Sequence, residues 1–139
     1  MVVVAGPSGS GKTTSFNIQG FGIDSFSVDD RCAQILGGYA HITQQVRRQA
    51  ARACERFVNE HLMGRRSFAV ETTLRTAISV EQAKLAGARG FLTIMTYVAA
   101  PTPEECVRRV LQRAKAGGHG ASEEQVRAII WTKSSSPAW

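Results

Sequence analysis

The sequence lacks long hydrophobic runs. Its strongly apolar stretches extend over only a few residues, whereas a transmembrane helix needs about 20. The first five residues are apolar but lead directly into a glycine-rich segment, without the basic region and full apolar core of a signal peptide. We therefore expect a cytoplasmic protein that makes no membrane contact.

Cysteine is scarce as well. The three cysteines, Cys32, Cys54 and Cys106, are too few, too scattered and odd in number for a disulfide framework. The sequence contains no C-x-x-C pair and no Cys/His cluster, which argues against a zinc site. We expect all three to be small, buried and reduced side chains.

The composition is otherwise that of an ordinary globular protein. With 139 residues, of which 43% are hydrophobic and 20% charged, the chain has the size of a single compact domain. Its formal net charge of +6 favours anionic partners such as nucleotides, sugar phosphates or nucleic acid, without choosing among them.

Short apolar runs alternate with helical patterns along the chain. Strands separated by helices are typical of βαβ units and a parallel sheet. Apolar residues at helical spacing predict a helix over residues 42–63, with Arg47 on the side opposite its apolar face. We place His41 and His61 on the surface or at a helix flank. Four apolar runs predict the strands, at Val2–Ala5, Phe26–Val28, Ser67–Val70 and Phe91–Val98.

Two further helices have capping signals. The segment Ser79–Gln82 is a capping box that predicts a helix start, and Gly87 is expected to end that helix. Thr102 is predicted to cap the next helix, with Pro103 at its first position and Glu105 reaching back to the cap amide.

The last part of the chain gives weaker signals. The helix that begins after Thr102 is expected to end at the glycine pair 117–118, and a final helix is predicted over residues 122–130. We assign residues 1–131 to one P-loop kinase-like domain, on the motif described next, and leave residues 132–139 as an unassigned tail. His119 is left open between a phosphate contact and a loop residue.

The strongest motif follows the first predicted strand. Residues 6–13 match the P-loop pattern G-x-x-x-x-G-K-S/T. Glycines in such a loop let backbone amides turn inward around a phosphate without a Cβ in the way. The lysine reaches the β- and γ-phosphates, the hydroxyl after it ligates Mg²⁺, and the helix that follows points its dipole at the same phosphates. We expect a nucleoside triphosphate to bind to Gly6, Pro7, Ser8, Gly9, Ser10, Gly11, Lys12, Thr13 and Thr14, with Thr13 as the Mg²⁺ ligand.

Two aspartates follow the second predicted strand. Asp29 and Asp30 come where the carboxyl end of a parallel strand faces the ligand crevice. A carboxylate there can hold Mg²⁺ or accept the proton of an attacking hydroxyl. The alternative is an aspartate that caps the following helix. We expect only one of the two to face the site.

Polar residues also follow the third predicted strand. Glu71 lies where the strand stops, and the alternation of side chains along extended backbone directs Glu71 and Thr73 to the same side. Together with Arg75 they offer a carboxylate, a hydroxyl and a guanidinium to a polyhydroxyl substrate. The alternative is an ion pair between Glu71 and Arg75 at the edge of the sheet.

Two arginines on the helix that follows Thr102 complete the candidate site. Arg109 and Arg113 are four residues apart and share a helix face, whereas Arg108 points about 100° away from Arg109. Near a γ-phosphate, two guanidiniums neutralise the charge that develops during phosphoryl transfer. The alternative is a solvated basic face.

These motifs together resemble the zeta toxin family of P-loop kinases, and more narrowly its short stand-alone members. The resemblance rests on AGPSGSGKTT, SVDDR, FAVETTLRT and RRVLQRAKAGGH, and runs from residue 1 to about residue 130 with order and spacing preserved. The P-loop is generic, whereas ETTLR combined with R-x-x-x-R and GGH is more specific. Family members that are understood use ATP or GTP with Mg²⁺ to phosphorylate the amino sugar of UDP-N-acetylglucosamine at its 3′-hydroxyl.

The resemblance implies a role for each matching residue. Lys12 takes the place of the P-loop lysine and Thr13 that of the Mg²⁺ ligand, while Asp29 matches the general base with Asp30 as the close competitor. It also implies a small helical antitoxin as a partner that blocks the nucleotide site. The implied phosphate-stabilising arginines are Arg109 and Arg113, and the implied substrate-binding residues are Asp30, Glu71, Thr73 and Arg75.

The sequence departs from the family near its end. Relatives usually continue through a further helix and an asparagine-rich strand end, which residues 133–139 do not resemble, and they often carry an arginine-tyrosine cluster where residues 129–131 stand. We expect a three-layer P-loop NTPase fold with a mostly parallel sheet of about four strands flanked by helices. Whether the last strand of that sheet is lacking stays open.

The leading functional hypothesis is a kinase. It would transfer the γ-phosphate of ATP or GTP, with Mg²⁺, to a hydroxyl of a small anionic acceptor or sugar nucleotide. A nucleotide-binding protein without transfer activity is the first alternative, because of the departures near the end of the chain. A nucleic-acid kinase or binder, suggested by the excess of arginine, is less favoured.

Overall fold

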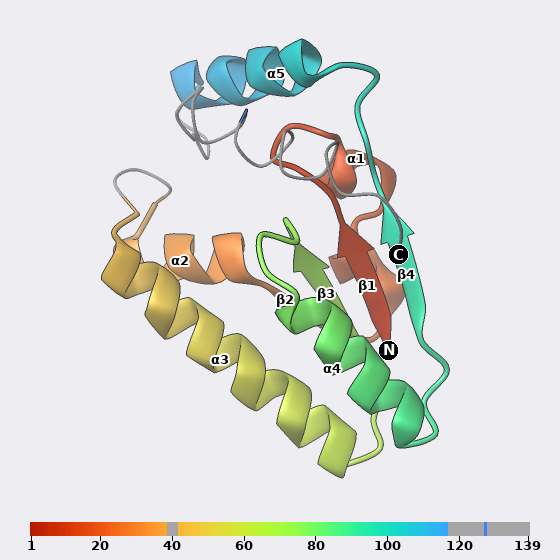
Figure 1. Cartoon of the computed structure of the whole chain (residues 1–139). Helices are drawn as coiled ribbons and strands as arrows, with labels where there is room; N and C mark the ends of the chain where they lie inside the picture. The colour runs from red at the N-terminus through yellow and green to blue at the C-terminus, as the bar shows by residue number, and fades with distance from the viewer. Residues whose placement is uncertain (39–41, 117–126, 128–139) are drawn as a thin grey trace.

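Four parallel strands form the centre of the protein. The computed structural model describes residues 1–38, 42–116 and 127 of the chain. The strands lie in the order β2-β3-β1-β4, and each pairs in parallel with its neighbours, so their carboxyl ends meet at one edge of the sheet, uppermost in Figure 1. This arrangement confirms the expected α/β class. The strands are β1 (Val2–Ala5), β2 (Asp24–Ser27), β3 (Phe68–Thr72) and β4 (Ile94–Tyr97).

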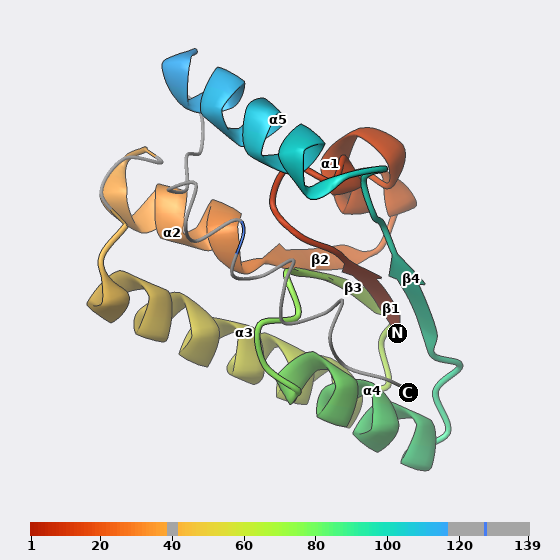
Figure 2. The ribbon, with the colours of Figure 1, turned by 45° about the horizontal axis from the view of Figure 1, so that its top comes forward.

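Helices surround this sheet. The helices α3 and α4 lie side by side along one face, and α5 crosses above the carboxyl ends of the strands, next to α1 (Figures 1 and 2). The predicted helix at residues 42–63 therefore exists, although it begins two residues later, after an N-cap by Thr43. The helices are α1 (Lys12–Ser15), the 3₁₀ helix η1 (Ile18–Phe21), α2 (Val28–Leu36), α3 (Gln44–Met63), α4 (Ile78–Ala88) and α5 (Pro103–Lys115).

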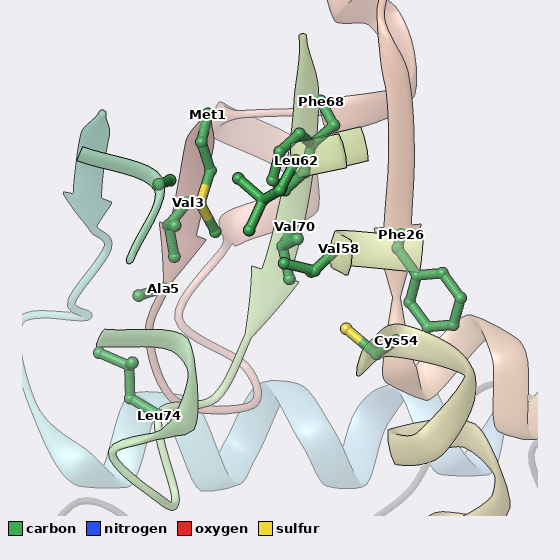
Figure 3. Close-up of a cluster of buried hydrophobic side chains, with 11 residues drawn as sticks. Met1, Val3, Ala5, Phe26, Cys54, Val58, Leu62, Phe68, Val70 and Leu74 are labelled. Carbon is green, nitrogen blue, oxygen red and sulfur yellow. The ribbon is translucent and has the colours of Figure 1, made fainter. Parts of the chain in front are cut away.

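The main hydrophobic core lies between the sheet and the helices α3 and α4. Figure 3 shows Val3 of β1 and Phe68 and Val70 of β3 packed with Val58 and Leu62 of α3. Each of these five side chains has at most 3% of its surface exposed. By the usual area relation, burying a side chain of this size stabilises the fold by about 1.5–3 kcal/mol.

The opposite face of the sheet carries a smaller core. Val4 of β1 and Ala69 of β3 pack there with Ile18 of η1. Val3 and Val4 are both completely buried, so β1 is covered on both faces. A strand buried on both faces needs an unbroken apolar sequence, which is what the first residues of the chain provide.

The three cysteines are buried free thiols, as expected. Cys32, Cys54 and Cys106 are at most 7% exposed. Burial raises the pKa of the Cys54 thiol to about 11, which keeps it protonated and unreactive at neutral pH.

The predicted ends of α4 are wrong. Ser79 does not cap this helix, because α4 already begins at Ile78 after Ala77 and Ser79 is buried in its first turn. Gly87 does not end it either. The helix ends in a Schellman motif around Gly90, whose φ is +84°: the Gly90 amide donates to the Gly87 carbonyl at 2.9 Å, and the next amide donates to the Ala86 carbonyl at 3.0 Å.

The predicted position of His61 is also wrong. Its side chain is only 3% exposed and lies between the rings of Phe57 and Phe68, at centroid distances of 4.1 and 5.3 Å. The ring nitrogens are satisfied by the Phe57 carbonyl at 2.7 Å and by the Asp24 carboxylate at 2.9 Å. The hydrogen bond from His61 lowers the pKa of Asp24. His61 is therefore a core residue that joins α3 to β2.

Other boundaries shift by a few residues. The second strand ends at Ser27, because Val28 already begins α2, and β4 is shorter than the apolar run at residues 91–98 that predicted it. The predicted helix at 122–130, the glycine pair 117–118, His41, His119 and the tail 132–139 lie outside the described residues, apart from residue 127. Among the residues that are described, no helix combines the length and the apolar character needed to cross a membrane.

Candidate phosphate-binding site

The loop after β1 is shaped by glycine. Gly6 and Gly9 have φ values of +147° and +82°, which side-chain-bearing residues rarely adopt. A Cβ at Gly6 would lie 2.2 Å from the carbonyl oxygen of Val98, and a Cβ at Gly9 would lie 2.3 Å from that of Cys106. Both positions therefore accept only glycine, and the second brings the loop directly against α5.

This shape leaves a set of amides free. The Gly6 amide donates to the Thr72 carbonyl and the Ser10 amide to the Pro7 carbonyl. Within the described ranges, the other non-proline amides up to the first turn of α1 make no hydrogen bond. Consecutive backbone N–H groups of this kind form a nest for anions. We call this set the amide nest; it comprises the N–H groups of Ser8, Gly9, Gly11, Lys12 and Thr13.

The helix after the loop is short. α1 is a single turn, and a turn of 3₁₀ helix follows it after Asn17. One turn has a small dipole, so the expected contribution of the helix dipole to phosphate binding is largely missing. The anion-binding capacity of the loop comes from the amide nest and from Lys12.

Lys12 is buried at the centre of the loop, with a relative exposure of 7%. Its ammonium group donates to the carbonyls of Gly6 at 2.9 Å and Pro7 at 3.1 Å, and the carboxylate of Glu71 lies 3.9 Å away. Burial lowers the pKa of Lys12, against the opposite effect of Glu71; burial likewise raises the pKa of Glu71, against the opposite effect of Lys12. The charge on Lys12 therefore stabilises the charge on Glu71, and the reverse also holds. A phosphate that enters the loop would provide Lys12 with a stronger partner.

A cavity of about 380 Å³ opens beside this lysine. The loop forms one side of it, and the junction of β2 with α2 forms another. Three carboxylates and two cations line it, so it combines acceptors for protons or metal with groups that attract phosphate. The lining residues are Ser8, Gly9, Gly11, Lys12, Thr13, Thr14, Ser27, Asp29, Asp30, Glu71 and Arg113.

Both aspartates line the cavity, and the expectation that only one of them faces it is wrong. They occupy the first turn of α2, and the N-cap of that helix is Ser27, whose hydroxyl accepts from the Asp30 amide at 3.3 Å. The alternative of a capping aspartate is therefore not realised. The carboxylate of Asp29 lies 3.5 Å from the guanidinium of Arg47.

Of the three polar residues predicted to follow the third strand, one lines the cavity, and this residue, Glu71, lies within β3 rather than after it. Glu71 lines it, whereas Thr73 and Arg75 are not among the described residues that do. The extended backbone ends at Thr72, so the alternation that would place Glu71 and Thr73 on one side does not continue. Leu74 turns the chain with a φ of +53° and is buried. The predicted alternative, an ion pair between Glu71 and Arg75, does not form, because Glu71 faces Lys12.

The two arginines of α5 have different surroundings. Arg113 lines the cavity. Arg109 instead contacts the loop: its Nη1 donates to the Gly9 carbonyl at 3.5 Å and its Nε to Glu105 at 2.9 Å. Arg108 also donates to Glu105, at 2.6 and 2.9 Å. The prediction that the Glu105 carboxylate accepts a hydrogen bond from the backbone amide of Thr102 is therefore wrong. Thr102 does cap α5, and Pro103 stands in its first turn, as predicted.

Sequence reasoning missed two residues of this region. Ser27 both caps α2 and lines the cavity, and the spacing S-x-x-D from Ser27 to Asp30 was an available signal. Arg47 was assigned to the solvent-facing side of its helix, but it is half-buried and pairs with Asp29. Nothing in the sequence near Arg47 indicates that pairing, because it depends on how α2 packs on α3.

The fold and the loop define a class: an α/β domain with a phosphate-binding loop, of the kind that nucleotide-dependent kinases use. A family model for an AAA domain, AAA_33, matches residues 1–132, and the chain belongs to this family. A search of curated proteins gives no match.

Several solved structures share the fold at low sequence identity. A chain of the Pnkp1/Rnl/Hen1 RNA repair complex has a TM-score of 0.70 and 18% identity; the match covers 96% of this chain but only 44% of that one. A kinase candidate from Chloroflexus aurantiacus has a TM-score of 0.69 and 18% identity, with 92% and 76% covered. The shikimate kinase of Acinetobacter baumannii, solved with shikimate, has a TM-score of 0.60 and 19% identity, with 96% and 75% covered.

These findings identify a P-loop kinase-like domain. The resemblance to the zeta toxin family of P-loop kinases predicted such a domain from the sequence. At such identities the likeness concerns the fold alone. The narrower family and its sugar-nucleotide substrate remain predictions.

Proposed function

We propose that this protein is a kinase that transfers the γ-phosphoryl group of a nucleoside triphosphate to the hydroxyl of a small acceptor. One observation carries the proposal: a single cavity joins the amide nest and the buried Lys12 to the carboxylates of Asp29 and Asp30. The first set suits a triphosphate, and the second suits a hydroxyl that has to lose its proton.

On the donor side, the amide nest and Lys12 would hold the β- and γ-phosphates of ATP or GTP. Mg²⁺ fits this cavity, because the Thr13 hydroxyl and the two aspartate carboxylates are hard oxygen donors that line it. Within the described residues no group of three His, Cys, Asp or Glu side chains forms a protein-only metal site, in keeping with an ion held partly by phosphates and water. The ion would supply positive charge that neutralises the phosphates.

On the acceptor side, Asp29 is the proposed general base, with Asp30 as the competitor. The carboxylate takes the proton of the acceptor hydroxyl, whose oxygen forms a bond to the γ-phosphorus. The bond from that phosphorus to the β,γ-bridging oxygen breaks, and a nucleoside diphosphate leaves. Arg113, which lines the cavity, is proposed to stabilise the charge that develops.

Arg109 is proposed to act on the same charge through the loop, since it holds the Gly9 carbonyl. Glu71, Thr73 and Arg75 are proposed for acceptor binding. The acceptor that the family resemblance implies is UDP-N-acetylglucosamine, and the antitoxin partner and the cytoplasmic location are proposed on the same basis.

The test is transfer of label from γ-labelled ATP or GTP in the presence of Mg²⁺. The acceptors are UDP-N-acetylglucosamine and other sugar nucleotides, hydroxy acids, sugar phosphates, aminoglycosides and short oligonucleotides. We expect one acceptor class to be labelled, no labelling by Lys12→Ala, and ATP binding without transfer by Asp29→Asn.

Two other outcomes would change the proposal. Transfer by Asp29→Asn at the wild-type rate would remove Asp29 as the base. Nucleotide binding by the wild type without transfer to any acceptor would favour the nucleotide-binding function over the kinase.

A further inference from the structure

The first turns of α5 lie against the phosphate-binding loop (Figures 1 and 2). A Cβ at Gly9 would lie 2.3 Å from the carbonyl oxygen of Cys106, so the two backbones are in direct contact. Beside this contact, Nη1 of Arg109 donates to the Gly9 carbonyl at 3.5 Å. The same nitrogen would lie 3.7 Å from a Cβ at Gly11. The guanidinium of Arg109 therefore lies over the loop, between these two glycines.

The peptide that joins Gly9 to Ser10 is held at both of its polar ends. Its carbonyl accepts the hydrogen bond from Arg109, and its N–H group, the Ser10 amide, donates to the Pro7 carbonyl at 3.2 Å. A peptide unit is planar, so two such bonds fix its rotation. The peptides on either side carry the Gly9 and Gly11 amides of the nest. The bonds that fix the central peptide therefore also restrict the directions of those two amides.

Glu105 holds Arg109 in the orientation that reaches the loop. Its Oε1 accepts from Nε of Arg109 at 2.9 Å, and Arg108 donates to both carboxylate oxygens, at 2.6 and 2.9 Å. The hydrogen bonds from Arg108 and then Arg109 lower the pKa of Glu105 to about 2, so the carboxylate is ionised at neutral pH. The side chain of Arg109 is 40% exposed. Without the carboxylate, this long side chain would be free to turn into the solvent.

We propose that Glu105 is a positioning residue of the phosphate-binding loop: it holds the Arg109 guanidinium on the Gly9 carbonyl and thereby keeps the amide nest in its phosphate-binding shape before the nucleotide arrives. This inference rests on the proposed function for the use of the loop, and it adds a residue that touches neither the phosphates nor the cavity. A binding site that is already ordered gains affinity, because less conformational freedom is lost on binding.

The geometry of arginine separates this role from a simple effect of charge. The guanidinium presents its N–H groups in a rigid fork, so Nε can bind Glu105 while Nη1 binds the Gly9 carbonyl. The ammonium group of a lysine has the same charge but lacks that fork. Arg109→Lys should therefore resemble the loss of Glu105 rather than the wild type.

The test follows amide hydrogen exchange by NMR in the nucleotide-free protein. The Ser10 amide reports on the central peptide. The Gly6 amide, which donates to the Thr72 carbonyl at 3.2 Å, is the reference within the same loop. The variants are Glu105→Gln and Arg109→Lys. Calorimetry with ADP and Mg²⁺ measures nucleotide affinity in the same proteins.

Glu104→Gln is the matched control. Glu104 is the other acidic residue in the first turn of α5, so its replacement removes the same charge from the same end of the helix. Its carboxylate pairs with Arg127 at 3.1 Å instead of with Arg109.

We expect the Ser10 amide to exchange roughly tenfold faster in Glu105→Gln and in Arg109→Lys than in the wild type, since a charge-assisted hydrogen bond is lost from its peptide. The exchange of the Gly6 amide should change much less. ADP should bind about 3- to 10-fold more weakly to both variants, because a smaller fraction of the molecules has a competent loop. Glu104→Gln should match the wild type in all three measurements.

Unchanged exchange of the Ser10 amide in Glu105→Gln would overturn the inference, as would an equal acceleration in Glu104→Gln. An equal acceleration of the Gly6 and Ser10 amides would show a general loss of stability and would also refute it. Arg109→Lys with the exchange and affinity of the wild type would leave only an effect of charge. If Glu105→Gln fails to fold, Arg109→Lys decides.

Failure of the proposed function is distinguishable from failure of this inference, because the exchange is measured without nucleotide or acceptor. The expected exchange pattern in a protein that binds ADP but transfers no phosphate keeps Glu105 as a positioning residue and refutes the kinase. Transfer to an acceptor with unchanged Ser10 exchange in the variants does the reverse.

Discussion

Replacing Gly9 by alanine should disconnect the phosphate-binding loop from α5. The new Cβ would lie 2.3 Å from the carbonyl oxygen of Cys106, a backbone atom within α5 that cannot rotate away. The φ of +82° adds a conformational cost of about 1–2 kcal/mol for alanine. Overpacking typically costs about 1–3 kcal/mol more. We therefore expect a loss of about 2–5 kcal/mol in the free energy of unfolding.

Gly22→Ala is the matched control. Gly22 also has a left-handed φ, +67°, but a Cβ there meets nothing within 4 Å. This variant should lose only the conformational part, about 1–2 kcal/mol.

Urea unfolding followed by circular dichroism measures both variants. With a slope of about 2 kcal/mol per M, Gly9→Ala should unfold at least about 1 M earlier than the wild type and clearly before Gly22→Ala. It should also bind ATP more weakly, because the Gly9 amide belongs to the nest. If the two variants agree within about 0.5 kcal/mol, the close contact between the loop and α5 is not what holds the loop in place.

Three further predictions concern groups outside the cavity. The hydrogen bonds from Arg108 and then Arg109 hold the pKa of Glu105 at about 2, so its contribution to stability is complete above the ordinary value of 4.5 and is lost as the pH falls toward 2. The difference in urea midpoint between the wild type and Glu105→Gln should therefore narrow over that interval; a constant difference would argue against the pairing. His61→Leu removes the link from α3 to Asp24 and should cost about 1–2 kcal/mol, whereas a variant as stable as the wild type would show that the link contributes nothing. At pH 8, a thiol reagent should label the native cysteines far more slowly than the urea-unfolded chain, because each has a raised pKa and is buried; rapid labelling of Cys54 in the folded protein would contradict its burial.

Features that depend on local chemistry could be predicted from the sequence. The unbroken apolar run of β1 follows from a strand that is buried on both faces, and the glycine spacing after it follows from backbone that approaches Val98 and Cys106 too closely for a Cβ. The start of α5 was predictable for a similar reason. The Thr102 hydroxyl accepts a hydrogen bond from an amide of the first turn that would otherwise be unpaired, and Pro103 has no amide hydrogen to leave unpaired.

Features that depend on contacts across the chain could not be predicted. The burial of His61 requires Asp24, which is 37 residues away and contributes its carboxylate from another element. The helix α4 has Gly90 rather than Gly87 just beyond its C-terminal cap: either glycine could end a helix, but only Gly90 adopts the left-handed φ. Arg109 shares a helix face with Arg113, as its spacing predicts, but only the docking of α5 on the loop directs it to the Gly9 carbonyl.

The central claim is that the loop around Lys12 binds the phosphates of a nucleotide. Isothermal titration of the purified protein with ATP and Mg²⁺ tests it most directly, with Lys12→Ala as the comparison. The account predicts a saturable signal for the wild type and an affinity lower by roughly 10- to 100-fold for the variant, since the charge-assisted contact of one ammonium group is lost. No detectable binding by the wild type at millimolar ATP, or equal affinity in the two proteins, would contradict it.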